Sequence, residues 1–219
     1  MEELTVPEIL QGFLRKDYLE HRAYLLQLLI NQFANENESQ CTDLVVTNNE
    51  SQEGQGPSQS DEPVKSSSHE SQPTNVDEDT FRQMTRILLD LVDNPKSSPE
   101  IIHLSLAALT NATIKEQYLI RFMDLLETAD SPISTKFHKS IENFLSYNPQ
   151  LESKEDIPEL WENEDPLQHV GSILCNISQN ERGRKILLHT KTNYMPKFPA
   201  QIRTQNPIRR RGVVGCIRR

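Results

Sequence analysis

The sequence predicts an all-α protein in which short helices stack as repeats. Three observations lead to this prediction. Apolar residues recur at helical spacing through most of the chain, prolines and capping residues divide it into short segments, and one small-residue motif occurs more than once. No stretch alternates between apolar and polar residues over a useful length, so the sequence predicts no strands.

Residues 1–34 predict one or two N-terminal helices, because apolar side chains follow three- and four-residue spacing up to Phe33. Residues 35–78 differ in kind: they contain eight serines, ten acidic residues and one lysine, and no aromatic residue. Such a segment buries too little apolar surface to offset roughly 1–2 kcal/mol of backbone ordering per residue. We therefore predict a disordered acidic insertion, followed by a repeat region over residues 79–219.

Within the repeat region, apolar stripes and start signals define seven further helices. A serine or aspartate before a proline opens a helix, because the side chain caps free N–H groups and proline suits the first turn. The expected helices follow Asp79, begin near Pro99, carry Tyr118 to Leu126, span about 133–147, begin at Asp165-Pro166, span 181–188 and begin near Ile208. The last is expected to run to the end of the sequence.

Two stretches of the chain repeat one motif, namely residues 105–113 (SLAALTNAT) and 170–178 (VGSILCNIS). Both place small residues before an apolar one and then read Leu-x-Asn-apolar-Ser/Thr. Small residues on a buried side let neighbouring repeats approach closely, and helix pairs that cannot hide their apolar faces alone stack into one core. The two stretches are therefore expected to lie side by side.

The spacing of the motif identifies the kind of repeat. A third stretch, 213–219, aligns Ile217 with Leu174, 43 positions earlier. This offset falls within the ~40–47-residue period of armadillo and HEAT repeats. The longer offset of 65 from Leu109 to Leu174 indicates an insertion, for which the acidic stretch 151–164 is the candidate. The predicted fold is an armadillo/HEAT-like α-solenoid.

Asn111 and Asn176 hold the same place in the two motifs, and two interpretations are open. They can be ordinary polar residues near helix ends that form local hydrogen bonds. Alternatively, they face the concave side of the solenoid, where an amide offers a donor and an acceptor to the backbone of an extended partner. We predict the second arrangement, in which both asparagines contact a partner.

Arg209, Arg210 and Arg211 complete the predicted partner-binding residues. Cations at a helix start are disfavoured by the helix dipole. That conflict suggests a partner or an acidic mate within the chain, such as the stretch 151–164. A solvated face and a nucleic-acid or nuclear-import patch are the other interpretations.

The sequence predicts no catalytic residues, no metal site and no cofactor. Glycine-rich phosphate loops, a nucleophile elbow and the HExxH motif are absent, and three cysteines fit no disulfide framework or zinc site. The chain shows neither a secretory signal nor an apolar run of ~20 residues, which predicts a cytoplasmic protein without a membrane span. The net charge of -9, with seven basic residues gathered in 197–219, disfavours a nucleic-acid-binding domain of the usual kind.

The runs 165–179 (DPLQHVGSILCNISQ) and 209–218 (RRRGVVGCIR) resemble motifs of the HGH family. These are armadillo-like cytosolic adaptors that help eukaryotic elongation factor 2 fold with the cytosolic chaperonin. The resemblance covers roughly residues 100–218 and implies a protein-binding adaptor or chaperone that is not an enzyme. Family members continue with Asn and Cys and a further repeat region where this sequence has Arg219, which implies a C-terminally truncated form. The alternative function is a basic-ended helical module that binds RNA or acts in nuclear transport.

Overall fold

The computed structural model of the chain describes residues 4–15, 21–46, 76–128, 131–146, 165–189, 194–204 and 206–218, and in 35–46 the backbone alone. Within these ranges the chain is helical and contains no strand, which confirms the predicted all-α class. Residues 47–75 of the predicted acidic insertion (35–78) and the acidic stretch 151–164 lie outside the described residues. None of the described helices is both long and apolar enough to cross a membrane.

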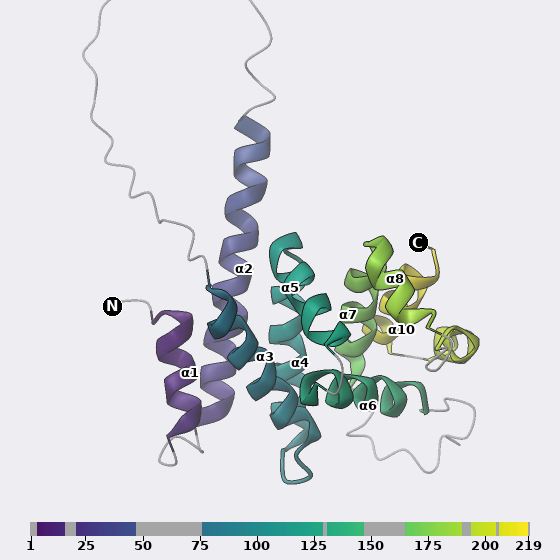
Figure 1. The fold of residues 1–219 in the computed structure, drawn as a ribbon, viewed down its shortest axis with the longest axis horizontal. Coiled ribbons are helices and arrows are strands. Elements are labelled where there is room, and N and C mark those ends of the chain that lie inside the picture. Colours follow the sequence, from purple (N-terminus) through teal and green to yellow (C-terminus); the bar gives the residue numbers. More distant parts are fainter. Residues whose placement is uncertain are drawn as a thin grey trace, which may run out of the picture.

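The helices follow one another along the longest axis of the molecule, with the N-terminal helices at one end and the C-terminal helices at the other (Figure 1). They are α1 (Val6–Leu14), α2 (Arg22–Val46), α3 (Glu78–Asp93), α4 (Pro99–Ala112), α5 (Glu116–Glu127), α6 (Pro132–Ser146), α7 (Gln168–Ser178), α8 (Glu181–Leu187), α9 (Phe198–Ile202) and α10 (Pro207–Ile217). A 3₁₀ turn, Met195–Lys197, precedes α9.

Side-chain caps mark the starts of α3 and α4; the start of α4 was predicted, whereas the cap at Asp77 was not. Asp77 caps α3 by accepting a hydrogen bond from the Thr80 N–H at 2.9 Å. Ser98 caps α4 by accepting from the Ile101 N–H at 3.3 Å, with a proline at the first helical position. Each cap satisfies an N–H group that has no partner inside the helix. The local sequence therefore defines these boundaries before any tertiary contact is considered.

Two boundaries differ from the predictions. Helix α2 continues to Val46, beyond the end of the apolar pattern, because extending a helix already held by α1 and α4 requires no new nucleus. Helix α7 begins at Gln168 and not at Pro166. The preceding residues form a turn in which an Asp165 carboxylate oxygen accepts from the Leu167 N–H at 3.0 Å. The Asp165 carboxylate also pairs with Arg209, which ties this turn to α10.

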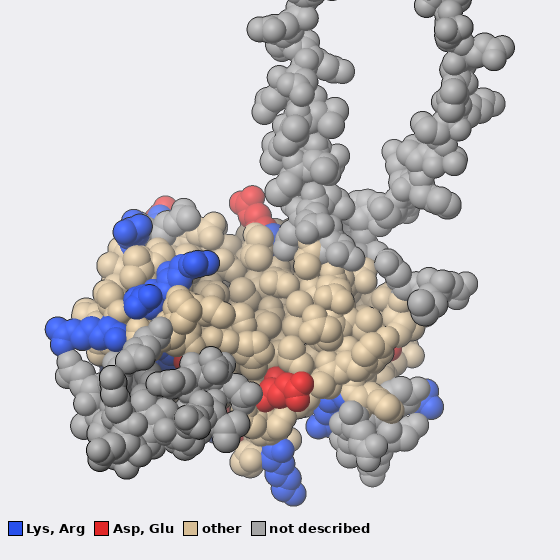
Figure 2. Space-filling view, turned by 180° about the vertical axis from the view of Figure 1, so that it is seen from behind, with Lys and Arg blue, Asp and Glu red and all other residues tan. Residues whose placement is uncertain are grey.

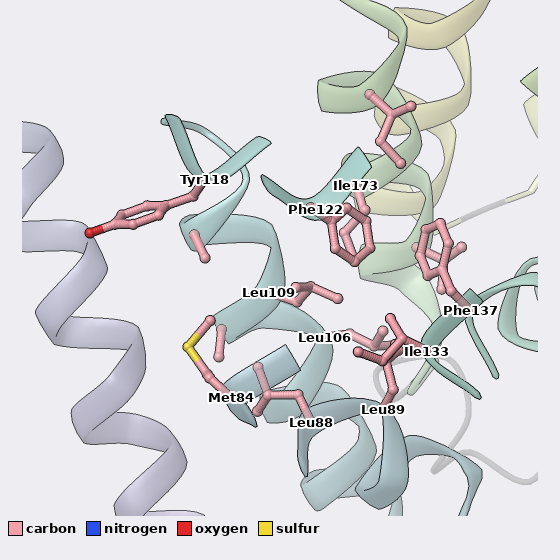
Figure 3. Close-up of a cluster of buried hydrophobic side chains, with 14 of the residues drawn as sticks. Met84, Leu88, Leu89, Leu106, Leu109, Tyr118, Phe122, Ile133, Phe137 and Ile173 are labelled. Carbon is pink, nitrogen blue, oxygen red and sulfur yellow. The ribbon is translucent and has the colours of Figure 1, made fainter. Parts of the chain in front are cut away.

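One hydrophobic core runs through the described helices, and Figure 3 shows part of it between α3, α4, α5, α6 and α7. The predicted stripe of α3 is largely buried, including Phe81. The Phe81 ring stacks on Tyr118 of α5 with centroids 5.3 Å apart, and Phe33 of α2 meets the Tyr118 ring edge to face at 5.6 Å. Burying a side chain of this size contributes ~1.5–3 kcal/mol, so this aromatic cluster anchors α2 to the repeat region.

The C-terminal end of the predicted insertion is also part of the folded structure. Val76 is only 5% exposed, and its N–H donates to the Tyr118 hydroxyl at 3.2 Å. Its carbonyl also accepts from the Arg121 guanidinium. A phenolic hydroxyl inside an aromatic cluster requires a hydrogen-bond partner, and the backbone just before α3 supplies it.

The repeated motifs lie on neighbouring helices, as predicted. Residues 105–113 belong to α4 and its C-terminal turn, and 170–178 belong to α7, which packs beside α4. Helix α10 in turn packs along α7 (Figure 1). Helices α7 and α10 approach each other closely, because glycines meet at their contact. A methyl group added at Gly212 would lie 2.3 Å from the carbonyl carbon of Gly171.

Substituting Gly212 with alanine tests this close approach. The new methyl group would overlap the α7 backbone, which cannot move aside as a side chain can, so the two helices must separate. We expect Gly212→Ala to lower the free energy of unfolding by ~1–3 kcal/mol or more. Chemical denaturation monitored by circular dichroism measures the change.

Gly12→Ala is the matched control. At Gly12 of α1 the added methyl would lie 3.0 Å from a terminal methyl of Leu25, which is the far end of a flexible side chain and not backbone. Alanine also gains roughly 0.5–1 kcal/mol over glycine in a helix interior. The stability of this variant should stay near that of the parent, and equal losses in both variants would contradict close α7–α10 packing.

Candidate partner-binding surface

Asn111 and Asn176 link successive helices of the stack. The Asn111 side-chain N–H donates to the Ile30 carbonyl of α2 at 3.3 Å. The Asn176 side-chain N–H₂ donates to the Thr110 carbonyl at 3.2 Å and to the Thr113 hydroxyl at 3.1 Å, both at the end of α4. Each motif asparagine therefore bonds to an earlier helix that packs beside its own, α2 for Asn111 and α4 for Asn176. These bonds have a structural role, as in the first interpretation, but they join different helices and are not local. Contact of the two asparagines with a partner stays a prediction.

A second polar chain crosses the other end of the same helices. Asn206 caps α10 by accepting from the Ile208 and Arg209 N–H groups, both at 3.0 Å. Its amide N–H donates to the Gln168 side-chain oxygen at 2.9 Å, and the Gln168 amide nitrogen lies 2.9 Å from Nδ1 of His103 in α4. An amide nitrogen only donates, so Nδ1 of His103 accepts and the proton of the neutral ring sits on Nε2.

Arg209 is buried at the centre of four segments, and its side chain is only 1% exposed. Its guanidinium forms a bidentate pair with the Asp165 carboxylate, with Nη2 and Oδ1 2.8 Å apart. Its Nη1 also donates to the Phe144 carbonyl of α6 at 2.7 Å and to the Gln201 side-chain oxygen of α9 at 3.0 Å. The guanidinium carbon stands 4.1 Å from the centroid of the Phe144 ring.

These contacts explain why a cation stands in the first turn of α10. The carboxylate, two further acceptors and the aromatic face together replace the interactions with water that the guanidinium loses on burial. The acidic mate expected within the chain is Asp165, one residue beyond the predicted stretch 151–164. Arg209 cannot at the same time contact a partner, so the interpretation of the cluster as one surface does not hold for this residue.

Arg210 and Arg211 are exposed. The Arg210 Nη1 donates to the Thr204 carbonyl at 3.5 Å, a long contact that leaves most of the guanidinium in solvent. Lys and Arg side chains gather over the end of the molecule that holds the C-terminal helices, on the left in Figure 2. The basic end of the sequence therefore forms a basic end of the structure, with one of its arginines withdrawn into the interior.

The exposed sides of α4, α7 and α10 form a continuous surface, because Asn176 bonds to the end of α4 and Gly215 lies against the Cys175 sulfur of α7. We call it the repeat face. Its half-buried and exposed residues include Ala107, Asn111, Ser172, Asn176, Arg211 and Gly215. Three of the five predicted partner-binding residues thus lie on this face, although both asparagines use amide N–H groups to hold neighbouring helices.

Burial, and not a catalytic partner, accounts for the perturbed groups near this face. Burial and, to a smaller extent, the neighbouring His103, with ring centroids 4.7 Å apart, together lower the pKa of His169 to about 4. Burial also raises the pKa of the Cys216 thiol to about 11, which keeps it a neutral, unreactive thiol. Among the described residues no group of three or more His, Cys, Asp or Glu side chains is placed to hold a metal ion.

A further cluster lies between α6 and the segment before α9. Nδ1 of His138 is 2.7 Å from the Tyr194 hydroxyl, and Tyr194 is only 1% exposed. Burial, reinforced by the negative charge of Glu142, raises the pKa of Tyr194 to about 12, and burial lowers the pKa of His138. The pair satisfies two buried polar groups and holds the Tyr194 segment on α6.

Sequence reasoning missed the residues that support the predicted ones. His103, Gln201 and Asn206 lie outside the motifs quoted above, and Gln168 lies in the run 165–179 without a distinguishing signal of its own. Only Asn206, directly before Pro207, carries a local signal as a helix cap. The others gain their roles from helices distant in sequence.

A family model described as a domain of unknown function, DUF383, matches residues 74–219, more than half of the chain. The match contains every described helix from α3 to α10. No curated protein and no solved structure matches the chain.

Removing the Asp165 carboxylate should show how strongly the stability of the fold depends on the buried ion pair. Asp165→Ala leaves the Arg209 charge buried without its counter-ion, so we expect a loss of ~3–5 kcal/mol in the free energy of unfolding. The control is Lys185→Ala, which breaks a pair between side chains 75% and 74% exposed and should cost under ~1 kcal/mol. The double variant Asp165→Ala with Arg209→Met tests the coupling of the two residues. If its loss of unfolding free energy equals the sum of the losses in the two single variants, the residues are not coupled.

The buried His169 predicts a pH dependence of stability. Its pKa is lowered from 6.5 to about 4 in the folded state, so the unfolded chain binds the proton more readily. Stability from this residue is complete above pH 6.5 and is lost as the pH falls toward 4. His169→Gln should flatten the fall in unfolding free energy over this window, whereas the exposed-site control His21→Gln should retain it. Parallel profiles for the parent and His169→Gln would refute the assignment.

Proposed function

The chain belongs to the DUF383 family, a domain family described as having no known function, and on this premise we propose that it is a protein-binding adaptor with armadillo-like repeats. By its resemblance to the HGH family, the adaptor assists eukaryotic elongation factor 2 to fold with the cytosolic chaperonin. It acts in the cytoplasm, without catalysis and without a cofactor.

This proposal is supported mainly by the hydrogen bonds that the motif asparagines form to neighbouring helices. Asn176 of the α7 motif bonds to the end of the α4 motif, and Asn111 bonds to α2. A bond that repeats from helix to helix builds a stack that can be extended, in which each unit presents one side to solvent. A face made in this way has the rigidity that a binding surface needs.

The repeat face supplies the contacts in this proposal. Its centre consists of small side chains, including Ala107 and Ser172, so a client backbone can approach the helices closely. The buried Arg209 and the amide N–H groups of Asn176 hold the face in place and do not contact the client directly. Arg211 remains as an exposed cation at its C-terminal edge.

Purified components test the proposal directly. The chain should retain elongation factor 2 in a pull-down and deliver a ternary complex with the chaperonin on size-exclusion chromatography. Ala107→Arg combined with Ser172→Arg should reduce retention of the factor by about tenfold or more, a change of ~1.4 kcal/mol in binding, because two bulky side chains would block the repeat face.

Gln83→Arg is the matched control, since it adds an arginine at an exposed position of α3, away from the repeat face. This variant should retain the factor as the parent does. The proposal fails if the parent chain recovers background proteins alone, or if the control loses retention as fully as the double variant.

RNA binding, or a role in nuclear transport, is the second candidate, and the exposed cations at the C-terminal end favour it (Figure 2). Binding through phosphate contacts falls steeply with salt. Retention of an RNA oligonucleotide at low salt, lost at high salt, would support this alternative. Absence of binding at low salt would exclude it.

A further inference from the structure

The exposed side of α10 combines three arginines with two apolar residues. Successive helical residues are turned by ~100°, so Arg210, Arg211, Val214, Ile217 and Arg218 share one side of the helix. Gly212 and Gly215 lie on other positions and contact α7. We call the side that carries the arginines the basic face of α10.

No carboxylate of the described residues forms an ion pair with the three arginines of the basic face. From Tyr194 to Arg218 the chain contains no aspartate or glutamate at all, and the Asp165 carboxylate is paired with the buried Arg209. Arg210 and Arg211 also stand in the first half of α10, where the helix dipole opposes a positive charge. Among the described residues no carboxylate compensates these charges as Asp165 compensates that of Arg209.

Apolar side chains are interleaved with these cations. Ile217 is 40% exposed, and Val214 is partly exposed beside it at helical spacing. Ile202 of α9 is 38% exposed, and the Arg210 contact to the Thr204 carbonyl joins the end of α9 to the basic face. A partner that satisfies both kinds of side chain must carry carboxylates around an apolar centre.

These features favour an acidic peptide over a nucleic acid. Single-stranded nucleic acids stack their bases on exposed aromatic rings. The aromatic residues of this part of the chain, Tyr194 and Phe198, are 1% and 0% exposed.

We propose that the basic face of α10 is the docking site for an acidic segment of a partner protein, with carboxylates opposite Arg210, Arg211 and Arg218 and one or two apolar residues opposite Val214 and Ile217. This inference rests on the proposed adaptor function and adds the chemistry of the segment recognised. Eleven residues form α10, so a helical partner segment of about the same length would cover it.

Fluorescence anisotropy with a labelled synthetic peptide of roughly 12 residues, glutamates flanking two leucines, tests the docking site. The full chain should bind this probe, and Arg211→Glu with Arg218→Glu should weaken binding by about tenfold or more. Arg86→Glu with Arg82→Glu, a matched charge reversal on exposed positions of α3, should leave the affinity unchanged. Raising salt from about 0.05 M to about 0.5 M should weaken binding, because exposed charges are screened.

Probe variants separate the two components of the site. A peptide with glutamine in place of glutamate should lose binding, and one with alanine in place of leucine should bind more weakly. Equal binding of the glutamine peptide, or an equal loss in the α3 control variant, would overturn the proposal. Tighter binding of a labelled RNA of similar length would overturn it in favour of a nucleic acid.

Two other occupants give distinct results. If the charge reversal on α10 abolishes self-association in sedimentation without changing peptide binding, the face joins two copies of the chain and the proposal is wrong. If the peptide binds only after the carboxylates of residues 151–164 are replaced by amides, the chain's own segment is the occupant, and the proposal is again wrong. If the chain binds elongation factor 2 but does not bind the peptide, this inference is wrong and the proposed adaptor function is not affected.

Discussion

Arg209 carries a full positive charge into the interior at 1% exposure, and four segments are shaped around it. The turn at Asp165 supplies the carboxylate, Phe144 of α6 supplies a carbonyl and an aromatic face, and Gln201 of α9 supplies an amide oxygen. A buried guanidinium with five N–H donors is tolerated only when acceptors surround it. The orientation of α10 relative to α6, α7 and α9 follows from that demand.

Polar side chains between neighbouring helices determine how the stack is held together. Asn176 donates a hydrogen bond to the end of α4, and Asn111 donates one to α2. The hydrogen bonds that join Asn206, Gln168 and His103 lie at the other end of the same helices. Such bonds have strict geometry, so they select one register among the many that apolar contact alone would permit. The residues available to a partner are consequently those between the polar chains and on the outer side of α10.

Much of the fold follows from local signals, while the candidate site does so only in part. Helix α4 begins at Pro99, as its Ser98-Pro99 signal predicts, and the stripe containing Phe81 is buried as its spacing predicts. The extent of α2 was underestimated because helix extension beyond a packed segment leaves no apolar signature. Arg209 could not be distinguished from Arg210 and Arg211, because three adjacent arginines look alike until a carboxylate distant in sequence is placed beside one of them.

The sequence by itself determined that the chain is helical, where most helices begin, and that two small-residue motifs repeat. These properties depend on spacing and capping within a few residues. Only the tertiary structure decided that the asparagines join helices, that Arg209 is internal and that Arg210, Arg211 and Arg218 are left exposed. The reason is that burial and hydrogen bonding are properties of pairs of segments, and the partners here are from about 40 to about 80 positions apart.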